Sequence, residues 1–216
     1  MKIYHLVSTL VLCSTLIACG AKAPKSKAVY MLIDTSGTYT RELDKAQRIG
    51  NYLLGSLNSG DSLAMARIDS GSFSEKDIIY KVTFDMRPSM ATTQKHRFKR
   101  QLDKFISTAK PSAHTDISGA VLQAAEFLNE TQAQEKYILI FSDLEEDLVR
   151  GQIRDFTLPL VQVKVVALNV TKLRSDNIDP RDYLNRLDDW EKRVSEGGGL
   201  WRVVNDLDRL DKLLDS

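Results

Sequence analysis

The stretch Val29-Tyr30-Met31-Leu32-Ile33-Asp34-Thr35-Ser36-Gly37-Thr38 decides the fold. It opens with an unbroken apolar run, as expected of a strand that is covered on both faces of its sheet. It then changes abruptly to carboxylate and hydroxyl side chains. Apolar runs that alternate with helical segments predict a parallel sheet with helices on both faces, and ligands of such sheets bind at the carboxyl ends of the strands.

The rest of the chain continues this alternation. A polar turn separates two expected strands at residues 63–68 and 78–84, which favours an antiparallel pair at one edge of the sheet. Further strands are expected at residues 137–141, 161–170 and 200–204, and helices at residues 41–57, 98–106, 117–128, 180–196 and 207–214. We therefore predict an α/β fold, a doubly wound and mostly parallel sheet of about six strands with helices on both faces.

Composition excludes several classes of function. The chain has 216 residues, with 30 Lys plus Arg against 29 Asp plus Glu, so its formal charge is +1. This near-neutral balance provides no net field for nucleic acid, and no nucleic-acid partner is expected. The 2 cysteines form no Cys-x-x-Cys pair, which argues against a disulfide scaffold and a thiolate zinc site.

The first residues are expected to target the chain rather than to enter its core. Lys2 precedes an apolar run at residues 6–17 that is too short to span a bilayer comfortably, and small residues follow. Leu16-Ile17-Ala18-Cys19 resembles the bacterial lipobox, which implies cleavage after residue 18 and acyl chains on Cys19. We thus expect a signal peptide at 1–18, a lipidated tether at 19–27 and a folded domain at 28–216.

The resemblance also implies a location. Gly20 after the cysteine is similar to lipoproteins of the outer membrane, so we expect a lipid-anchored domain in the periplasm; surface exposure or an inner-membrane position stays open. The eight residues from Gly20 to Lys27 extend at most about 28 Å, which keeps the domain close to its membrane.

Three polar clusters follow strands or open helices: Asp34 to Thr38, His114-Thr115-Asp116, and Ser142-Asp143. Each taken singly is a common helix cap. Taken together they supply the hard oxygen ligands that Mg²⁺ accepts, with water completing the shell. The candidate metal ligands are Asp34, Ser36, Thr38, Thr115 and Asp143.

This set resembles the metal-ion-dependent adhesion site (MIDAS) of the von Willebrand factor A (vWA) domain. The family has Asp-x-Ser-x-Ser after the first strand, a threonine in a later loop and an aspartate after the fourth strand. The resemblance implies direct metal contacts from Ser36, Thr38 and Thr115, and contacts mostly through water from Asp34 and Asp143. It implies Mg²⁺, with Mn²⁺ or Ca²⁺ as alternatives, and a protein partner that offers an acidic residue to the metal.

Two features depart from that family. Leu144-Glu145-Glu146-Asp147 stands where a glycine usually follows the aspartate, and we interpret its acids as a solvated helix start in preference to a second cation site. The chain between Asp143 and Val161 is short and contains Pro159, which predicts a short or irregular crossover helix.

Two other readings remain. Asp34-Thr35-Ser36-Gly37-Thr38 also resembles the first motif of haloacid-dehalogenase-type phosphatases, with Asp143 and Asp147 as a magnesium-binding pair. Ser36 stands where that chemistry needs a carboxylic acid, and a hydroxyl near its usual pKa is a poor acid or base. A structural vWA scaffold with an empty metal site is the third reading. We expect a binding protein rather than an enzyme.

Overall fold

The computed structural model describes residues 25–214 apart from 38, 174 and 209. The expected signal peptide, the Cys19 anchor and the candidate ligand Thr38 lie outside the described residues. None of the helices within the described ranges has the length and apolar character needed to cross a membrane.

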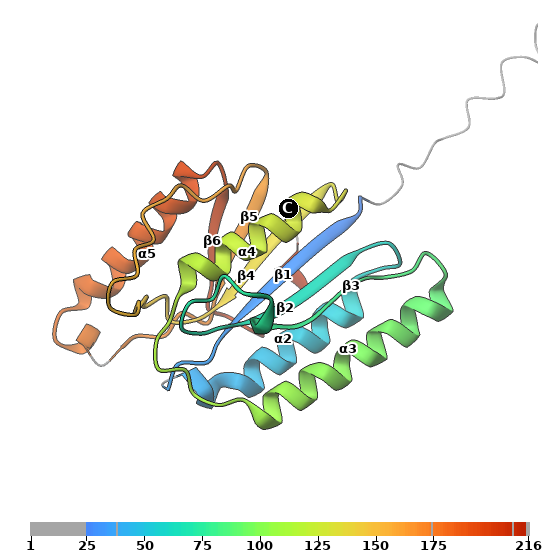
Figure 1. Cartoon of the computed structure of the whole chain (residues 1–216), viewed down its shortest axis with the longest axis horizontal. Coiled ribbons are helices and arrows are strands. Elements are labelled where there is room, and N and C mark those ends of the chain that lie inside the picture. The colour runs from blue at the N-terminus through green and yellow to red at the C-terminus, as the bar shows by residue number, and fades with distance from the viewer. Residues whose placement is uncertain (1–24, 38, 174, 209, 215–216) are drawn as a thin grey trace, which may run out of the picture.

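The core of the fold is a sheet in which the strands follow the order β3-β2-β1-β4-β5-β6 (Figure 1). All neighbouring pairs are parallel except β2 with β3, which is antiparallel. The α/β class and the antiparallel edge pair are thereby confirmed. The strands are β1 (Lys27–Asp34), β2 (Ser62–Ile68), β3 (Ile78–Thr83), β4 (Glu135–Phe141), β5 (Val163–Leu168) and β6 (Leu200–Val204).

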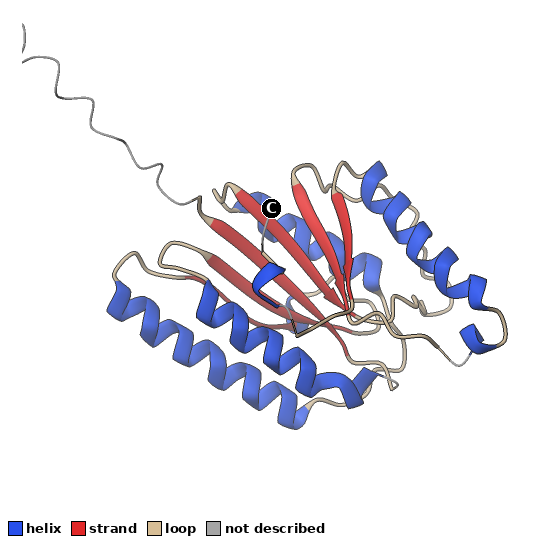
Figure 2. Cartoon of the chain, turned by 180° about the vertical axis from the view of Figure 1, so that it is seen from behind, coloured by secondary structure: helices blue, strands red, loops and turns tan. Residues whose placement is uncertain are grey.

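Helices cover both faces of this sheet. Helices α2 (Leu43–Ser56) and α3 (Pro88–Thr108) pack on one face, and α4 (Ile117–Glu130) and α5 (Pro180–Glu196) on the other (Figures 1 and 2). Short 3-10 turns complete the structure: η1 (Tyr39–Glu42), η2 (Glu75–Asp77), η3 (Ser175–Asn177) and η4 (Leu210–Lys212).

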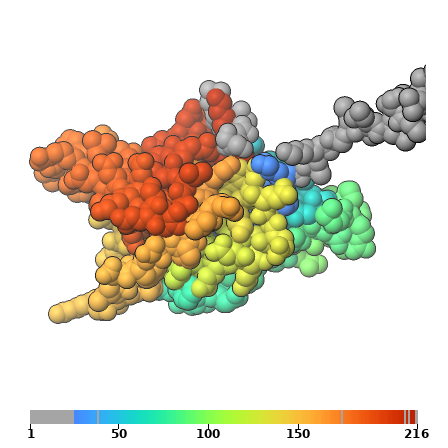
Figure 3. Space-filling view, turned by 90° about the horizontal axis from the view of Figure 1, so that it is seen from above, coloured from blue at the N-terminus to red at the C-terminus, as the bar shows by residue number. Residues whose placement is uncertain are grey.

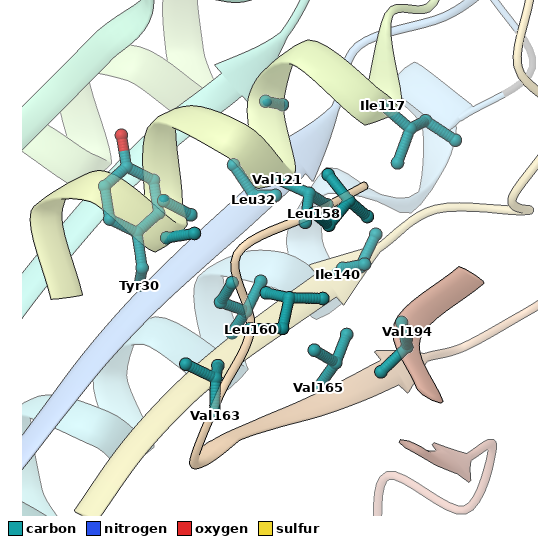
Figure 4. Packing of buried hydrophobic residues seen from close by; sticks show 14 of the residues in the cluster. Tyr30, Leu32, Ile117, Val121, Ile140, Leu158, Leu160, Val163, Val165 and Val194 are labelled. Atoms are coloured by element: carbon teal, nitrogen blue, oxygen red, sulfur yellow. The ribbon is translucent and has the colours of Figure 1, made fainter. Parts of the chain in front are cut away.

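Strand β1 is central and is buried on both faces, as its apolar run predicts. Tyr30 and Leu32 belong to the core beneath α4, whereas Met31 and Ile33 belong to the core beneath α2 and α3. Figure 4 shows Leu32 close to Val121 of α4. Each fully buried side chain of this size contributes roughly 1.5–3 kcal/mol of transfer free energy, so both cores hold β1 in place.

Two expected helices are absent from the described residues. The leucine spacing at 207–214 predicted a terminal helix, but only the turn η4 forms there. The carbonyls of Lys212 and Leu213 accept hydrogen bonds from the Arg202 guanidinium, and Leu213 and Leu214 are buried against the sheet. The leucines therefore reach the core from an irregular segment.

The connection between β4 and β5 contains no helix in residues 142–162, all of which the structure describes. The expected crossover helix is therefore absent and the connection is irregular, and the acidic helix start was wrong. Leu144 has a φ of 67°, a left-handed conformation that an α-helix excludes. In Figure 3 this yellow-to-orange segment stands out from the body of the molecule. We call residues 142–162 the β4–β5 segment.

Candidate metal centre

Asp34 lies at the carboxyl end of β1 with its carboxylate fully buried. Oδ1 accepts a hydrogen bond of 2.7 Å from the backbone N–H of Ser36, and Oδ2 accepts one of 2.6 Å from the hydroxyl of Ser142. The second contact forms because β1 and β4 are neighbours, with Ile33 paired to Phe141, so the residues that follow them meet at one edge. Two of the three polar clusters are thus joined directly.

The electrostatic state of Asp34 is that of a buried charge with neutral partners. Burial raises the pKa of its carboxyl above the ordinary 3.8, and the hydrogen bonds from Ser142 and Ser36 offset only part of that rise. No Lys, Arg or His within the described ranges forms a salt bridge with it. A buried carboxylate without a positive partner is costly, so this site favours a cation.

Thr115 lies in the loop that precedes α4 and is 5% exposed. Its backbone exchanges two hydrogen bonds with Asp147, of 2.8 and 3.0 Å. A few residues earlier, the N–H of Ser112 donates to the carbonyl of Thr35 at 2.8 Å. These bonds fasten the threonine loop between the segment after β1 and the segment after β4, as a shared site requires.

Asp143 follows β4 and is 3% exposed. Its Oδ1 accepts a hydrogen bond from the N–H of Glu145 at 3.0 Å, and its carbonyl accepts one from Nε of Arg186 at 2.9 Å. Arg186 also pairs with the buried carboxylate of Asp176 at 2.9 Å. Helix α5 thereby fixes the backbone at Asp143. The structure places Asp34, Ser36, Thr115 and Asp143 at the carboxyl edge of the sheet.

The three acids after Leu144 are engaged separately. Glu145 lies 3.5 Å from Arg186, and Asp147 lies 3.0 Å from Nδ1 of His114. Glu146 accepts from the N–H of Ser118 at 2.6 Å and pairs with Arg193 at 3.3 Å. They brace the β4–β5 segment against α4 and α5. Among the described residues, no group of three or more His, Cys, Asp or Glu side chains is placed to hold a metal ion.

Tyr39 and Asn169 are residues that the sequence analysis missed. The Tyr39 hydroxyl donates to the carbonyl of Asn169, whose side-chain amide in turn donates to Oε2 of Glu42 at 3.3 Å. Burial raises the pKa of Tyr39, and the negative charges of Asp143 and Asp34 raise it further. Asn169 has a φ of 54°, and asparagine is among the residues that tolerate this region; that preference was the available signal.

Asp116, adjacent to Thr115, is a structural residue rather than a ligand. Its buried carboxylate accepts from the N–H groups of Gly119 at 2.8 Å and Ser72 at 2.9 Å, and from the Arg154 guanidinium at 2.5 Å. Burial opposes the charge, but the hydrogen bonds from Arg154 and Gly119 outweigh it and hold the pKa of Asp116 below its ordinary value. Asp116 therefore links α4, the loop after β2 and the β4–β5 segment.

The chemistry of the donor set fits a hard divalent cation. Two buried carboxylates and the hydroxyls of Ser36 and Thr115 are oxygen donors of the kind that Mg²⁺ accepts. Few anionic donors leave such a cation under-neutralised, so a carboxylate from outside would gain a charge-assisted bond.

Comparison with known proteins supports the fold alone. No protein-family model and no curated protein sequence matches the chain. The D319A mutant of the PilB minor pilin from Streptococcus sanguinis is 11% identical with a TM-score of 0.56, covering 90% of this chain and 61% of that one. A von Willebrand factor type A structure from Catenulispora acidiphila is 11% identical with a TM-score of 0.55, covering 88% and 41%.

The pilus adhesin SpaC from Lactobacillus rhamnosus GG, in an open conformation, is 10% identical with a TM-score of 0.54, covering 90% and 30%. This chain thus spans less than two thirds of the length of each of these three neighbours. The architecture is that of a vWA-like domain.

Proposed function

We propose that this protein is a lipid-anchored binding module whose vWA-like domain holds a divalent cation and, through it, an acidic residue of another protein. The observation that carries the proposal is the state of Asp34. Its carboxylate is fully buried and hydrogen-bonded to neutral donors, at the strand end where the vWA resemblance expects a metal ligand.

The surrounding residues support a cation rather than a hydrolytic site. In this proposal, the hydroxyls of Ser36, Thr38 and Thr115 contact the metal directly. Asp34 and Asp143 contact it mostly through bound water. Bound there, Mg²⁺ supplies a Lewis-acidic position that a carboxylate oxygen can occupy. Asp147 makes a poor partner for Asp143 in phosphatase chemistry, because it is 62% exposed and contacts His114 instead.

The vWA-like scaffold also supports a binding role. Two of the solved neighbours are described as a minor pilin and a pilus adhesin. That the present protein binds another protein is our extension from the shared scaffold and from the donor set, and its metal dependence is the property to test first.

The lipid anchor places the site in a definite orientation. β1 begins at Lys27, a few residues after the expected acylated Cys19, and Asp34 ends the same strand. Figure 2 shows β1 beginning at one end of the sheet, with the arrows of the parallel strands converging at the opposite end. We therefore expect the candidate metal centre to face away from the tethering membrane.

Titration calorimetry of Mg²⁺ and Mn²⁺ into a form that begins at Gly20 tests the proposal. Binding is expected for the wild type and for the control Asp44→Ala, which changes an exposed acid on α2, and is expected to be lost in Asp34→Ala and Thr115→Ala. A panel of phosphatase substrates is run on the same samples. Absence of metal binding by the wild type refutes the proposal, and turnover that depends on Asp34 replaces it with the phosphatase reading.

A further inference from the structure

A pocket lies between the start of β3 and the end of α3, outside the candidate metal centre. Its volume is about 430 Å³, within the range of small-molecule sites. Arg67 of β2 and Asp77 contribute to its lining, Ile79 and Phe105 contribute apolar surface, and Lys104 and Lys110 come from the end of α3 and the residues after it. The pocket thus combines apolar, cationic and carboxylate groups.

Asp77 carries an unsatisfied buried atom. Its side chain is fully buried; Oδ1 lies 3.1 Å from Nε of Arg67, whereas Oδ2 has no hydrogen-bond partner. Buried carboxylate oxygens are nearly always satisfied, and an exception calls for a missing donor. Arg67 pairs with Oδ1 of Asp77 and also with Asp69 at 2.7 Å, so Oδ1 has a cationic partner and Oδ2 lacks a hydrogen-bond donor.

Three lysines contribute positive charge to the pocket lining, and the charge of Lys76 also acts on the carboxylates of Asp69 and Asp77. Lys76, Lys104 and Lys110 are exposed, and none forms a salt bridge with another residue that the structure describes. Together with Arg67 against Asp77, they give the lining a formal charge of +3, from four cations and one carboxylate. These cations repel an ammonium group, so the donor that reaches Oδ2 has to be neutral, such as a hydroxyl.

The geometry points to a binding site for a small phosphomonoester that bears a free hydroxyl group. The phosphate meets the lysines, since a dianion offsets more of the +3 lining than a monoanion does. The hydroxyl donates to Oδ2 of Asp77, and the carbon skeleton lies on Ile79 and Phe105. Oδ2 is closed to solvent in the structure, so side chains of the lining have to move before the ligand hydroxyl reaches it.

Calorimetry with three probes tests this site on the form that begins at Gly20, in EDTA so that the candidate metal centre plays no part. Glycerol 3-phosphate is expected to bind at least about tenfold more tightly than methyl phosphate, because methyl phosphate lacks the free hydroxyl that donates to the charged group of Asp77. Glycerol alone is expected not to bind. Equal affinities for the two phosphates refute the role of Asp77.

Variants distinguish binding in this pocket from nonspecific attraction of phosphate to surface lysines and arginines. The double variant Lys104→Ala/Lys110→Ala is expected to weaken glycerol 3-phosphate binding at least tenfold. The matched control Arg100→Ala removes an exposed charge on the same helix outside the pocket and is expected to change the affinity less than twofold. Equal losses in both variants, or no saturable binding by the wild type, overturn the assignment. Folded Asp77→Asn, checked by circular dichroism, is expected to lose the preference for the hydroxyl-bearing probe.

Discussion

The hydroxyl of Ser142 donates a 2.6 Å hydrogen bond to Oδ2 of Asp34, across 108 positions of sequence. Ser142 in turn accepts a hydrogen bond from the N–H of Leu144 at 3.0 Å. This pair joins the ends of β1 and β4 and sets where both carboxylates of the candidate metal centre lie. The contact is neutral, so it positions Asp34 without compensating its charge.

Replacement of Asp34 by Asn is expected to stabilise the metal-free protein at pH 7. Burial raises the pKa of Asp34 above its ordinary 3.8, so the stability linked to this group is present below pH 3.8 and is lost as the pH rises through the folded-state pKa. Asn removes that charge. Each kcal/mol of relief raises the melting temperature by about 2–4 °C, which thermal unfolding in EDTA measures.

Metal is expected to affect the wild type and Asp34→Asn differently. Saturating Mg²⁺ is expected to raise the melting temperature of the wild type and to leave that of Asp34→Asn unchanged, because only a form that binds the ligand gains stability from it. As the pH falls toward 3.8, the advantage of Asn in EDTA is expected to disappear. A pH-independent advantage would contradict the linkage to Asp34.

Replacement of Asp116 by Ala is expected to destabilise the fold by about 3–5 kcal/mol at neutral pH, since it leaves Arg154 without its buried partner. The pKa of Asp116 is lowered, so its contribution is present above pH 3.8 and is lost as the pH falls through the folded-state pKa. Urea unfolding at pH 7 and in acid measures both effects. Arg87→Ala, which breaks an exposed pair with Asp85, serves as the control and is expected to have little effect.

Two glycine substitutions are expected to act in opposite directions. A Cβ at Gly119 would lie 2.5 Å from Oδ2 of Asp116, so Gly119→Ala forces the carboxylate to move and costs about 1–3 kcal/mol. A Cβ at Gly55 in α2 meets nothing within 4 Å, and Gly55→Ala is expected to add about 0.5–1 kcal/mol of stability. Denaturant midpoints compare the two. Equal changes in stability for Gly119→Ala and Gly55→Ala would show that the Asp116 carboxylate moves at little cost in free energy.

Replacement of Cys19 by Ser is expected to release the protein from the membrane fraction. Acyl chains on residue 19 are the only attachment that we propose, and a thiol-free side chain cannot carry them. Fractionation of cells that express the wild type, Cys19→Ser and the control Cys13→Ser measures the change. Retention of Cys19→Ser in membranes would contradict the lipidated tether.

Strands and helices with a strong hydrophobic period were predictable from the sequence. The apolar run of β1 is confirmed because every side chain from Val29 to Ile33 is buried. Helix α5 is confirmed over the expected residues, Pro180–Glu196. The leucines at 207–214 have a helical spacing, but this segment forms a short turn instead of a helix. Leu213 and Leu214 are nevertheless buried.

Contacts between distant side chains were not predictable. Arg154 meets Asp116 38 positions away, and it does so from a segment that has no hydrophobic period. The irregular backbone of residues 142–162 depends on such contacts, including that of Glu146 with the N–H of Ser118. A single sequence specifies where polar clusters lie on strand ends, whereas the bonds that orient them arise only when the loops are packed together.

The central strand β1 has a mechanical consequence. It covers the distance from the tether to Asp34 in 8 residues, with parallel neighbours paired along both of its sides. In the proposed function, a partner that pulls on the candidate metal centre puts tension on this covalent line toward the anchor. Force applied between the two ends of β1 passes along its backbone, so it does not have to be transmitted through the ladders to β2 and β4.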